Sequence, residues 1–151
     1  MNIKFLIPKI YFLTIGKFLP TDVFADWFPV SVKGIVWIED KVVLLKNERG
    51  EWDLPGGKLA NNETLSECLF REVNEELGII CEVGGLASTV QVRVKNMINV
   101  VVIIYNCTTS ATIPELVISS EHAELGCFSA SELEHINILP QYREAILQNL
   151  K

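Results

Sequence analysis

The sequence predicts an α/β domain with a mixed central sheet and helices on both of its faces. Strand-like segments lie on both sides of one amphipathic helix, and a second helical segment closes the chain. The length of 151 residues is that of one domain with a sizeable core. Hydrophobic and charged contents of 49% and 21% are ordinary for a globular protein, and neither a repeat nor a second domain is visible.

The first part of the domain reads as a hairpin that leads into a glycine-rich loop. Residues 30–39 and 42–46 are rich in Val and Ile, and a turn at Asp40 separates them. Residues 51–54 form a short extended piece. The following Pro55-Gly56-Gly57 is typical of a turn, because two glycines permit backbone geometry closed to other residues.

A helix is predicted over residues 65–77. Thr64, with Glu67 three residues later, forms a capping box at its start, and Gly78 is a C-cap. At helical spacing, one face of this helix is apolar and is expected to pack into a core. The residues assigned to that face are Leu69, Phe70, Val73 and Leu77.

The second half of the chain supplies further strands and the closing helix. Residues 82–89 read as the start of a strand with a bulge or loop, and 90–94 alternate as a half-buried strand should. Residues 98–107 are almost wholly apolar, which fits a central buried strand. The remaining elements are an edge strand or irregular arm, a short strand, a helical turn and a C-terminal helix, at 115–120, 124–128, 131–133 and 140–150.

An apolar segment, residues 1–28, precedes the domain expected at 29–151. Pro8 suits the first turn of a helix, so this segment is predicted to be a helical extension. Three lysines interrupt its apolar run, which argues against both a signal peptide and a membrane span. Packing on the domain or across a homodimer is the favoured interpretation. A helix on a membrane surface and a lid over a substrate site are the alternatives.

Three glutamates of the predicted helix share one face. Glu72, Glu75 and Glu76 are spaced i, i+3 and i+4, so their side chains emerge together at the border of the apolar face. Like charges this close repel unless a cation lies among them. Arg71 can neutralise one carboxylate, and a hard divalent cation with oxygen ligands best fits the other two. The alternative for the helix alone is a solvated acidic face.

A longer pattern with fixed gaps surrounds these glutamates. Gly57 is followed after five residues by Glu63, and after seven more by Arg71-Glu72-Val73-Asn74-Glu75-Glu76-Leu77-Gly78-Ile79. This pattern resembles a complete Nudix box, and its fixed spacing makes it highly specific. Ala60 and Asn62 depart from the commonest wording of the family, at positions outside the strict signature. The resemblance implies a Nudix-type α/β/α sandwich in which the catalytic loop and helix follow the first strands.

The resemblance also implies a hydrolase that uses Mg²⁺ or Mn²⁺ and cleaves the pyrophosphate linkage of a nucleoside diphosphate derivative. A pyrophosphate is strongly anionic, so a cation is needed between it and the carboxylates. Glu75 and Glu76 are the expected principal metal ligands, with Glu72 as a third ligand or a contact to the base. The Gly56 carbonyl is the expected backbone ligand.

Further site residues are expected around these ligands. Arg71 is expected to orient a carboxylate through a charge-assisted bond, and Glu63 to fix the loop to the helix. The general base comes either from the box or from a later loop, where Glu121 is the candidate. Lys58 is a candidate phosphate contact, although an exposed loop lysine is more often solvated. Trp52 is a candidate for stacking on a base, although aromatic residues in strands are more often part of a core.

Downstream of the box, the sequence leaves the substrate open. A Pro that many ADP-ribose enzymes carry in this region is missing, since no Pro occurs between Ile79 and Ile113. The stretch 31–59 looks like small hydrolases of nucleoside triphosphates or nucleotide sugars. We therefore expect a (deoxy)nucleoside triphosphate or an ADP-ribose-like substrate. The rival is a catalytically silent Nudix-like nucleotide-binding or regulatory module, which the intact set of box carboxylates disfavours.

The net charge and the cysteines restrict the possible binding partners and the cellular compartment. The net charge of −6 argues against stable nucleic-acid binding, whereas a small nucleotide can bind if a metal supplies positive charge. The four cysteines are scattered without a Cys-x-x-Cys pair, and those at 68, 107 and 127 lie in apolar patterns. They are expected to be buried free thiols of a cytoplasmic protein. Two isolated histidines do not complete a zinc site with them.

Overall fold

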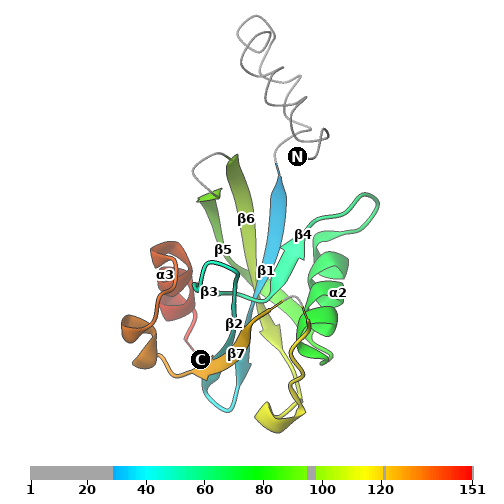
Figure 1. Cartoon of the computed structure of the whole chain (residues 1–151). Coiled ribbons are helices and arrows are strands. Elements are labelled where there is room, and N and C mark those ends of the chain that lie inside the picture. The colour runs from blue at the N-terminus through cyan, green and yellow to red at the C-terminus, as the bar shows by residue number, and fades with distance from the viewer. Residues whose placement is uncertain (1–28, 95–97, 121, 151) are drawn as a thin grey trace, which may run out of the picture.

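The computed structural model describes residues 29–94, 98–120 and 122–150, which form one sheet with a helix on each face (Figure 1). The helix expected within 1–28 and the turn expected at 95–96 lie outside these residues. In chain order the elements are β1 (Val30–Ile38), β2 (Lys41–Lys46), β3 (Trp52–Asp53), β4 (Gly56–Lys58), α2 (Leu65–Leu77), β5 (Glu82–Val94), β6 (Ile98–Thr108), η2 (Ile113–Glu115), β7 (Glu124–Phe128), η3 (Glu132–His135) and α3 (Pro140–Gln148).

The sheet is mixed, as the sequence predicted. Seven strands belong to it, with the order β3-β2-β1-β6-β5, and β4 and β7 pair with β1 and β2. β1 and β6 run parallel, whereas the other pairs between the described strands are antiparallel. The apolar β6 therefore lies inside the sheet, between β1 and β5, which confirms its predicted central position.

Side chains alternate across the sheet, so each face has its own core. On one face, Val32 and Val36 of β1 and Val43 of β2 pack with Leu69 and Val73 of α2. The other core joins strand side chains to α3, which lies on the opposite side of the sheet in Figure 1. Its main members are Ile35, Trp37, Val42, Leu44, Ile104, Tyr142, Ala145 and Ile146.

β1 changes its antiparallel partner along its length, from β4 to β2. This change places β4, here called the glycine strand because it contains Gly56 and Gly57, next to α2. Its first part, around Lys33, pairs with β4, and its last part, around Ile38, pairs with β2. Between the two, Gly34 N–H donates to the Pro55 carbonyl at 2.9 Å. A Cβ on Gly34 would lie 2.9 Å from Cys107 Sγ and 3.3 Å from a methyl group of Leu69, so a larger residue at this crossing would require these side chains to shift.

One loop prediction needs correction. Pro55-Gly56-Gly57 was predicted to be a turn, but Gly56 and Gly57 belong to strand β4, whose partner lies more than twenty residues upstream. For residues 115–120 the second predicted alternative is confirmed, because Glu115 ends η2 and residues 116–120 form an irregular arm. The bulge expected near 82–89 is confirmed by register shifts in the β5–β6 pairing between Val83, Leu86 and Ser88.

The cysteines are free thiols, and no described helix is a candidate membrane span. Cys68, Cys81 and Cys107 are buried, whereas Cys127 is half-buried. Buried thiols were predicted at 68, 107 and 127, so the structure confirms the first two of these and shows Cys127 partly open. None of the helices between residues 29 and 150 combines the length and the apolar character that crossing a bilayer requires.

Candidate active site

Helix α2 is fixed at both ends by the caps that the sequence predicted. The Thr64 hydroxyl accepts from Glu67 N–H at 3.2 Å, and the Glu67 carboxylate accepts from Thr64 N–H at 2.8 Å. Gly78 ends the helix with φ 68°, a left-handed conformation, and its N–H donates to the Asn74 carbonyl. These local bonds satisfy backbone groups that a helix end leaves open, so the register of the glutamates is well defined.

The buried face of α2 differs from the prediction at two positions. Phe70 was assigned to the apolar face, but its side chain is 43% exposed. Glu76, predicted at the border, is one of the buried residues, at 7% exposed. Helical geometry accounts for Glu76, because position 76 lies two turns after Leu69 on the same side of the helix.

The Glu76 carboxylate is held in the interior by the glycine strand. Its Oε2 accepts from Gly56 N–H at 2.7 Å, and its Oε1 lies 3.4 Å from His122 Nε2. Burial raises the pKa of Glu76 to about 7, although the Gly56 N–H and the Lys33 ammonium favour the charged form. A carboxylate desolvated this far gains strongly from a nearby cation.

Glu72 lies against the backbone of Gly57. A Cβ at position 57 would run into the carboxylate of Glu72, so the glycine creates the space that this side chain occupies. One guanidinium nitrogen of Arg71 bonds Glu72 Oε1 at 2.8 Å and Glu75 Oε2 at 3.3 Å. Arg71 therefore contacts two of the three glutamates of the glutamate strip, which is the name used here for Glu72, Glu75 and Glu76.

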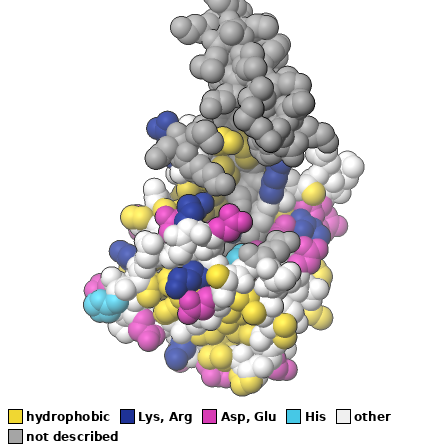
Figure 2. Space-filling model, in the orientation of Figure 1, with side chains coloured by type: hydrophobic (Ala, Val, Ile, Leu, Met, Phe, Trp, Pro, Cys, Tyr) yellow, Lys and Arg dark blue, Asp and Glu magenta, His cyan; other side chains and the backbone are white. Residues whose placement is uncertain are grey.

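Arg71 also ties the helix to the loop that precedes it. Its Nε and Nη2 donate to the two oxygens of Glu63 at 3.1 and 3.0 Å, a paired arrangement typical of arginine and carboxylate. Ala60 N–H donates to the same carboxylate at 2.6 Å. The Arg71 guanidinium and this N–H lower the pKa of Glu63 to about 2. Figure 2 shows acidic side chains gathered around a basic one at the α2 edge of the molecule.

The arm that follows η2 closes the C-terminal end of α2. Val117 N–H donates to the Leu77 carbonyl at 2.9 Å, and Ser119 N–H donates to the Glu76 carbonyl at 3.1 Å. These bonds satisfy carbonyls that the helix end leaves free, and they place His122 beside Glu76. Sequence reasoning missed this contact. Glu121, the candidate base, lies outside the described residues.

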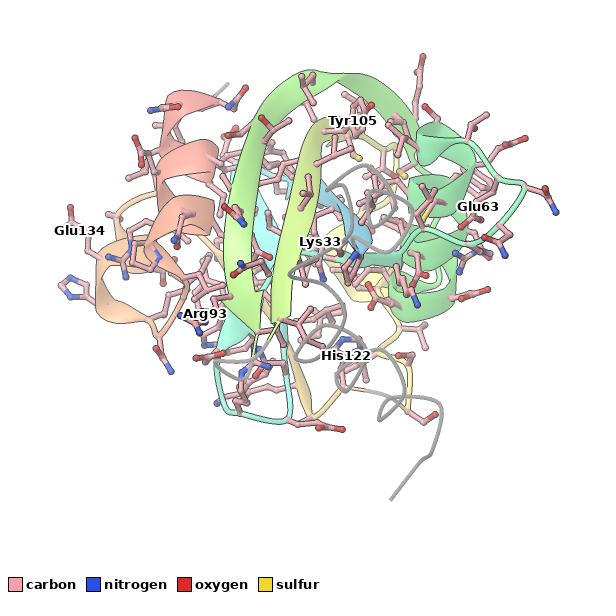
Figure 3. The ribbon with its side chains drawn as sticks, turned by 90° about the horizontal axis from the view of Figure 1, so that it is seen from above. Lys33, Glu63, Arg93, Tyr105, His122 and Glu134 are labelled. Carbon is pink, nitrogen blue, oxygen red and sulfur yellow. The ribbon has the colours of Figure 1, made fainter. Side chains whose placement is uncertain are left out.

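Lys33 is a second site residue that the sequence reasoning missed. Its ammonium donates to the carbonyl of Gly56 at 2.7 Å and to that of Leu54 at 2.9 Å, and it lies 3.4 Å from Asp53 Oδ2. The only signal for it was one cation within an otherwise apolar strand. Lys33, Glu63 and His122, labelled in Figure 3, come from β1, from the loop before α2 and from the arm after η2.

The two candidate substrate contacts are placed differently. Lys58 is exposed at the end of β4, next to Gly57. Trp52 is 8% exposed and packs edge-to-face against Phe128, with ring centroids 4.7 Å apart. The indole therefore belongs to the core and presents no free face to a base, contrary to its assignment as a substrate contact. Its local sequence is an alternating strand, which fits a core position equally well.

The candidate donor atoms suit a hard divalent cation, because the Glu72, Glu75 and Glu76 carboxylates and the Gly56 carbonyl all offer oxygens, as Mg²⁺ and Mn²⁺ prefer. Glu76 accepts from Gly56 N–H and Glu72 lies against Gly57, whereas Glu75 contacts Arg71. Within 29–94, 98–120 and 122–150, however, no three acidic, His or Cys side chains are already arranged around a common metal position. Glu72 and Glu75 bond the Arg71 guanidinium instead.

Comparisons with known proteins agree with the fold and the motif. The family model of the NUDIX domain matches residues 27–149. The chain is similar to the 8-oxo-dGDP phosphatase NUDT18 of Homo sapiens, at 43% identity over 54 residues, 33% of this chain and 17% of that protein. It is also similar to an ADP-ribose pyrophosphatase of Methanocaldococcus jannaschii, at 38% identity over 61 residues, 38% of this chain and 36% of the relative.

The chain spans well under half the length of these two curated relatives. The structural comparison covers more of the chain. The crystal structure of a MutT protein from Methanosarcina mazei Go1 superimposes with a TM-score of 0.70 and 27% identity. The superposition covers 80% of this chain and 91% of that one. The chain belongs to the Nudix family, because the family model spans most of its length and agrees with the complete box and the α/β/α arrangement.

Proposed function

We propose that this protein is a Mg²⁺- or Mn²⁺-dependent pyrophosphohydrolase that acts on a nucleoside diphosphate derivative. The observation that carries the proposal is the buried Glu76 carboxylate, which bonds the glycine strand and lies on the same helix as Glu72 and Glu75. A desolvated carboxylate that contacts the glycine strand and shares its helix with two further carboxylates is an arrangement that a divalent cation stabilises.

In the reaction, a water oxygen forms a bond to one phosphorus, and the bond from that phosphorus to the bridging oxygen breaks. When bound, a divalent cation supplies positive charge to the phosphate oxygens and makes the attacking water more acidic. Glu75, Glu76 and the Gly56 carbonyl are proposed to hold the cation, with Glu72 as third ligand or contact to the base. Glu121 is the proposed acceptor of the proton from water.

Arg71 and Glu63 are proposed to position the ligands rather than to bind the cation. Glu63 holds Arg71 by two bonds on the loop side, so the guanidinium stays near the strip when Glu72 and Glu75 turn towards a cation. Lys58, exposed at the end of β4, is the proposed phosphate contact. Since Trp52 is buried, base recognition falls to other residues.

The substrate class remains the pair expected from the sequence, a (deoxy)nucleoside triphosphate or an ADP-ribose-like compound. Support comes from relatives whose names specify 8-oxo-dGTP and ADP-ribose. A silent nucleotide-binding module is the second candidate. It is favoured by the ion pairs that Arg71 makes with Glu72 and Glu75, which engage two of the three carboxylates.

The test is incubation of the full chain with Mg²⁺ and a panel of nucleoside triphosphates, ADP-ribose, nucleotide sugars and dinucleoside polyphosphates. Products are identified by chromatography, and thermal stabilisation by Mg²⁺ is measured in parallel. Cleavage of one compound well above the others would support the hydrolase and name its substrate. Stabilisation by Mg²⁺ and nucleotide without any cleavage would favour the binding module.

A further inference from the structure

The Lys33 ammonium is bound by residues 53–56, which lead into strand β4. It donates to the carbonyls of Gly56 at 2.7 Å and Leu54 at 2.9 Å, and it forms an ion pair with Asp53 Oδ2 at 3.4 Å. The side chain is 12% exposed, so these bonds are largely shielded from water. Two hydrogen bonds and one ion pair to a single backbone segment give Lys33 a structural role.

The Gly56 backbone is consequently held from two sides. Its N–H donates to Glu76 at 2.7 Å, and its carbonyl accepts from Lys33 at 2.7 Å. Gly56 has φ 125°, a conformation that L side chains rarely adopt, and a Cβ there would run into the Val32 carbonyl. A backbone in this conformation needs partners that define it, and Lys33 and Glu76 supply them from β1 and α2.

We propose that Lys33 is a positioning residue that presets the Gly56 peptide for cation binding. The proposal rests on the proposed function in one respect, that the Gly56 carbonyl and Glu76 receive the cation. The carbonyl oxygen has two lone pairs, so it can accept from Lys33 and still face a cation. The role assigned to Lys33 is to fix where this oxygen and the Gly56 N–H point.

Electrostatics and positioning predict opposite effects when Lys33 loses its charge. The ammonium is close enough to Glu76 to influence its pKa, so it also repels a cation bound there. If charge alone mattered, Lys33→Met would bind Mg²⁺ more tightly than the wild type. If Lys33 positions Gly56, the same variant binds Mg²⁺ more weakly, despite the loss of a repelling charge.

The first experiment needs neither metal nor substrate. Hydrogen exchange of the Gly56 amide is measured by NMR in the metal-free protein for wild type, Lys33→Met and Lys41→Met. Lys41 lies at the far end of the β1–β2 pairing, so it is the matched control. We expect exchange of the Gly56 amide to be about tenfold faster in Lys33→Met and unchanged in Lys41→Met, since the charge-assisted bonds that hold the backbone at Leu54 and Gly56 are lost.

The second experiment measures Mg²⁺ affinity by calorimetry on the same variants, with an expected loss of about tenfold for Lys33→Met. The Asp53→Asn variant keeps the bonds from Lys33 to the carbonyls, so its Gly56 amide should exchange at the wild-type rate. The double variant Lys33→Met/Asp53→Asn leaves no unpaired carboxylate, and it serves if the single variant fails to fold. Unchanged Gly56 exchange in the folded variant, or tighter Mg²⁺ binding, would overturn the proposal. If the wild type hydrolyses no compound but the Gly56 amide exchanges faster in Lys33→Met, the proposed hydrolase activity is refuted and the positioning role of Lys33 is not.

Discussion

Replacing Glu76 by glutamine should stabilise the metal-free protein at neutral pH and leave its stability unchanged in acid. The folded-state pKa of Glu76 is raised to about 7 from an ordinary value of 4.5, because the carboxyl is buried. The protonated form therefore favours folding. This contribution is fully present below pH 4.5 and is lost as the pH rises through 7. Glutamine cannot lose a proton, so it keeps the favourable neutral state throughout.

The size of the effect follows from the shift. A change from 4.5 to about 7 corresponds to roughly 3 kcal/mol at about 1.4 kcal/mol per pKa unit. The free energy of unfolding of Glu76→Gln, relative to the wild type, should rise by about this amount between pH 4 and pH 8. Mg²⁺ should reduce the difference at pH 8, because a cation stabilises the charged carboxylate of the wild type.

The assay is urea denaturation of both proteins in EDTA at several pH values. Both are also measured in a His122→Asn background, because the His122 imidazole lies 3.4 Å from the Glu76 carboxylate. Glu75→Gln is the matched control, since its carboxylate is 60% exposed on the same helix. A stability difference that stays flat from pH 4 to pH 8 would show that burial does not hold the proton on Glu76.

Two further predictions concern the loop and the ion pairs beside the strip. Gly57→Ala should cost about 1–3 kcal/mol in urea denaturation, because its Cβ would meet the Glu72 carboxylate, whereas Gly85→Ala, with open space around its Cβ, should cost far less. The pKa of Glu63 is lowered, so its bond to Arg71 stabilises the fold above pH 4.5, and this contribution is lost as the pH falls towards 2. Melting temperatures of Arg71→Met and the wild type should therefore converge over this acid range; a constant gap would contradict the assignment.

The parts of the site that depend on local sequence were predictable. The bounds of α2 follow from Thr64, Glu67 and Gly78, because capping bonds form between residues close in the chain. Arg71 was expected to hold a carboxylate and Glu63 to fix the loop to the helix, and in the structure the two residues form an ion pair with each other. In each case the signal lies within a few turns of helix or within one loop.

The parts that depend on pairing between distant segments were not predictable in the same way. Gly56 and Gly57 form a strand only because residues 31–33 of β1 lie beside them. Nothing local to Lys33 shows that its ammonium reaches the carbonyls of Leu54 and Gly56. The burial of Glu76 was accessible in principle from its spacing of seven residues after Leu69, but an acidic residue on a helix is normally placed at the surface.

The most direct test of the central claim, that the glutamate strip of α2 supports metal-dependent pyrophosphate hydrolysis, is turnover of the best substrate as a function of Mg²⁺ concentration. It should be measured for the wild type, Glu75→Gln and Glu76→Gln, with circular dichroism to establish that each variant is folded. Loss of several orders of magnitude in kcat, with the fold retained, is the predicted result for either variant. Turnover close to that of the wild type in either folded variant, or turnover that persists in EDTA, would contradict the claim.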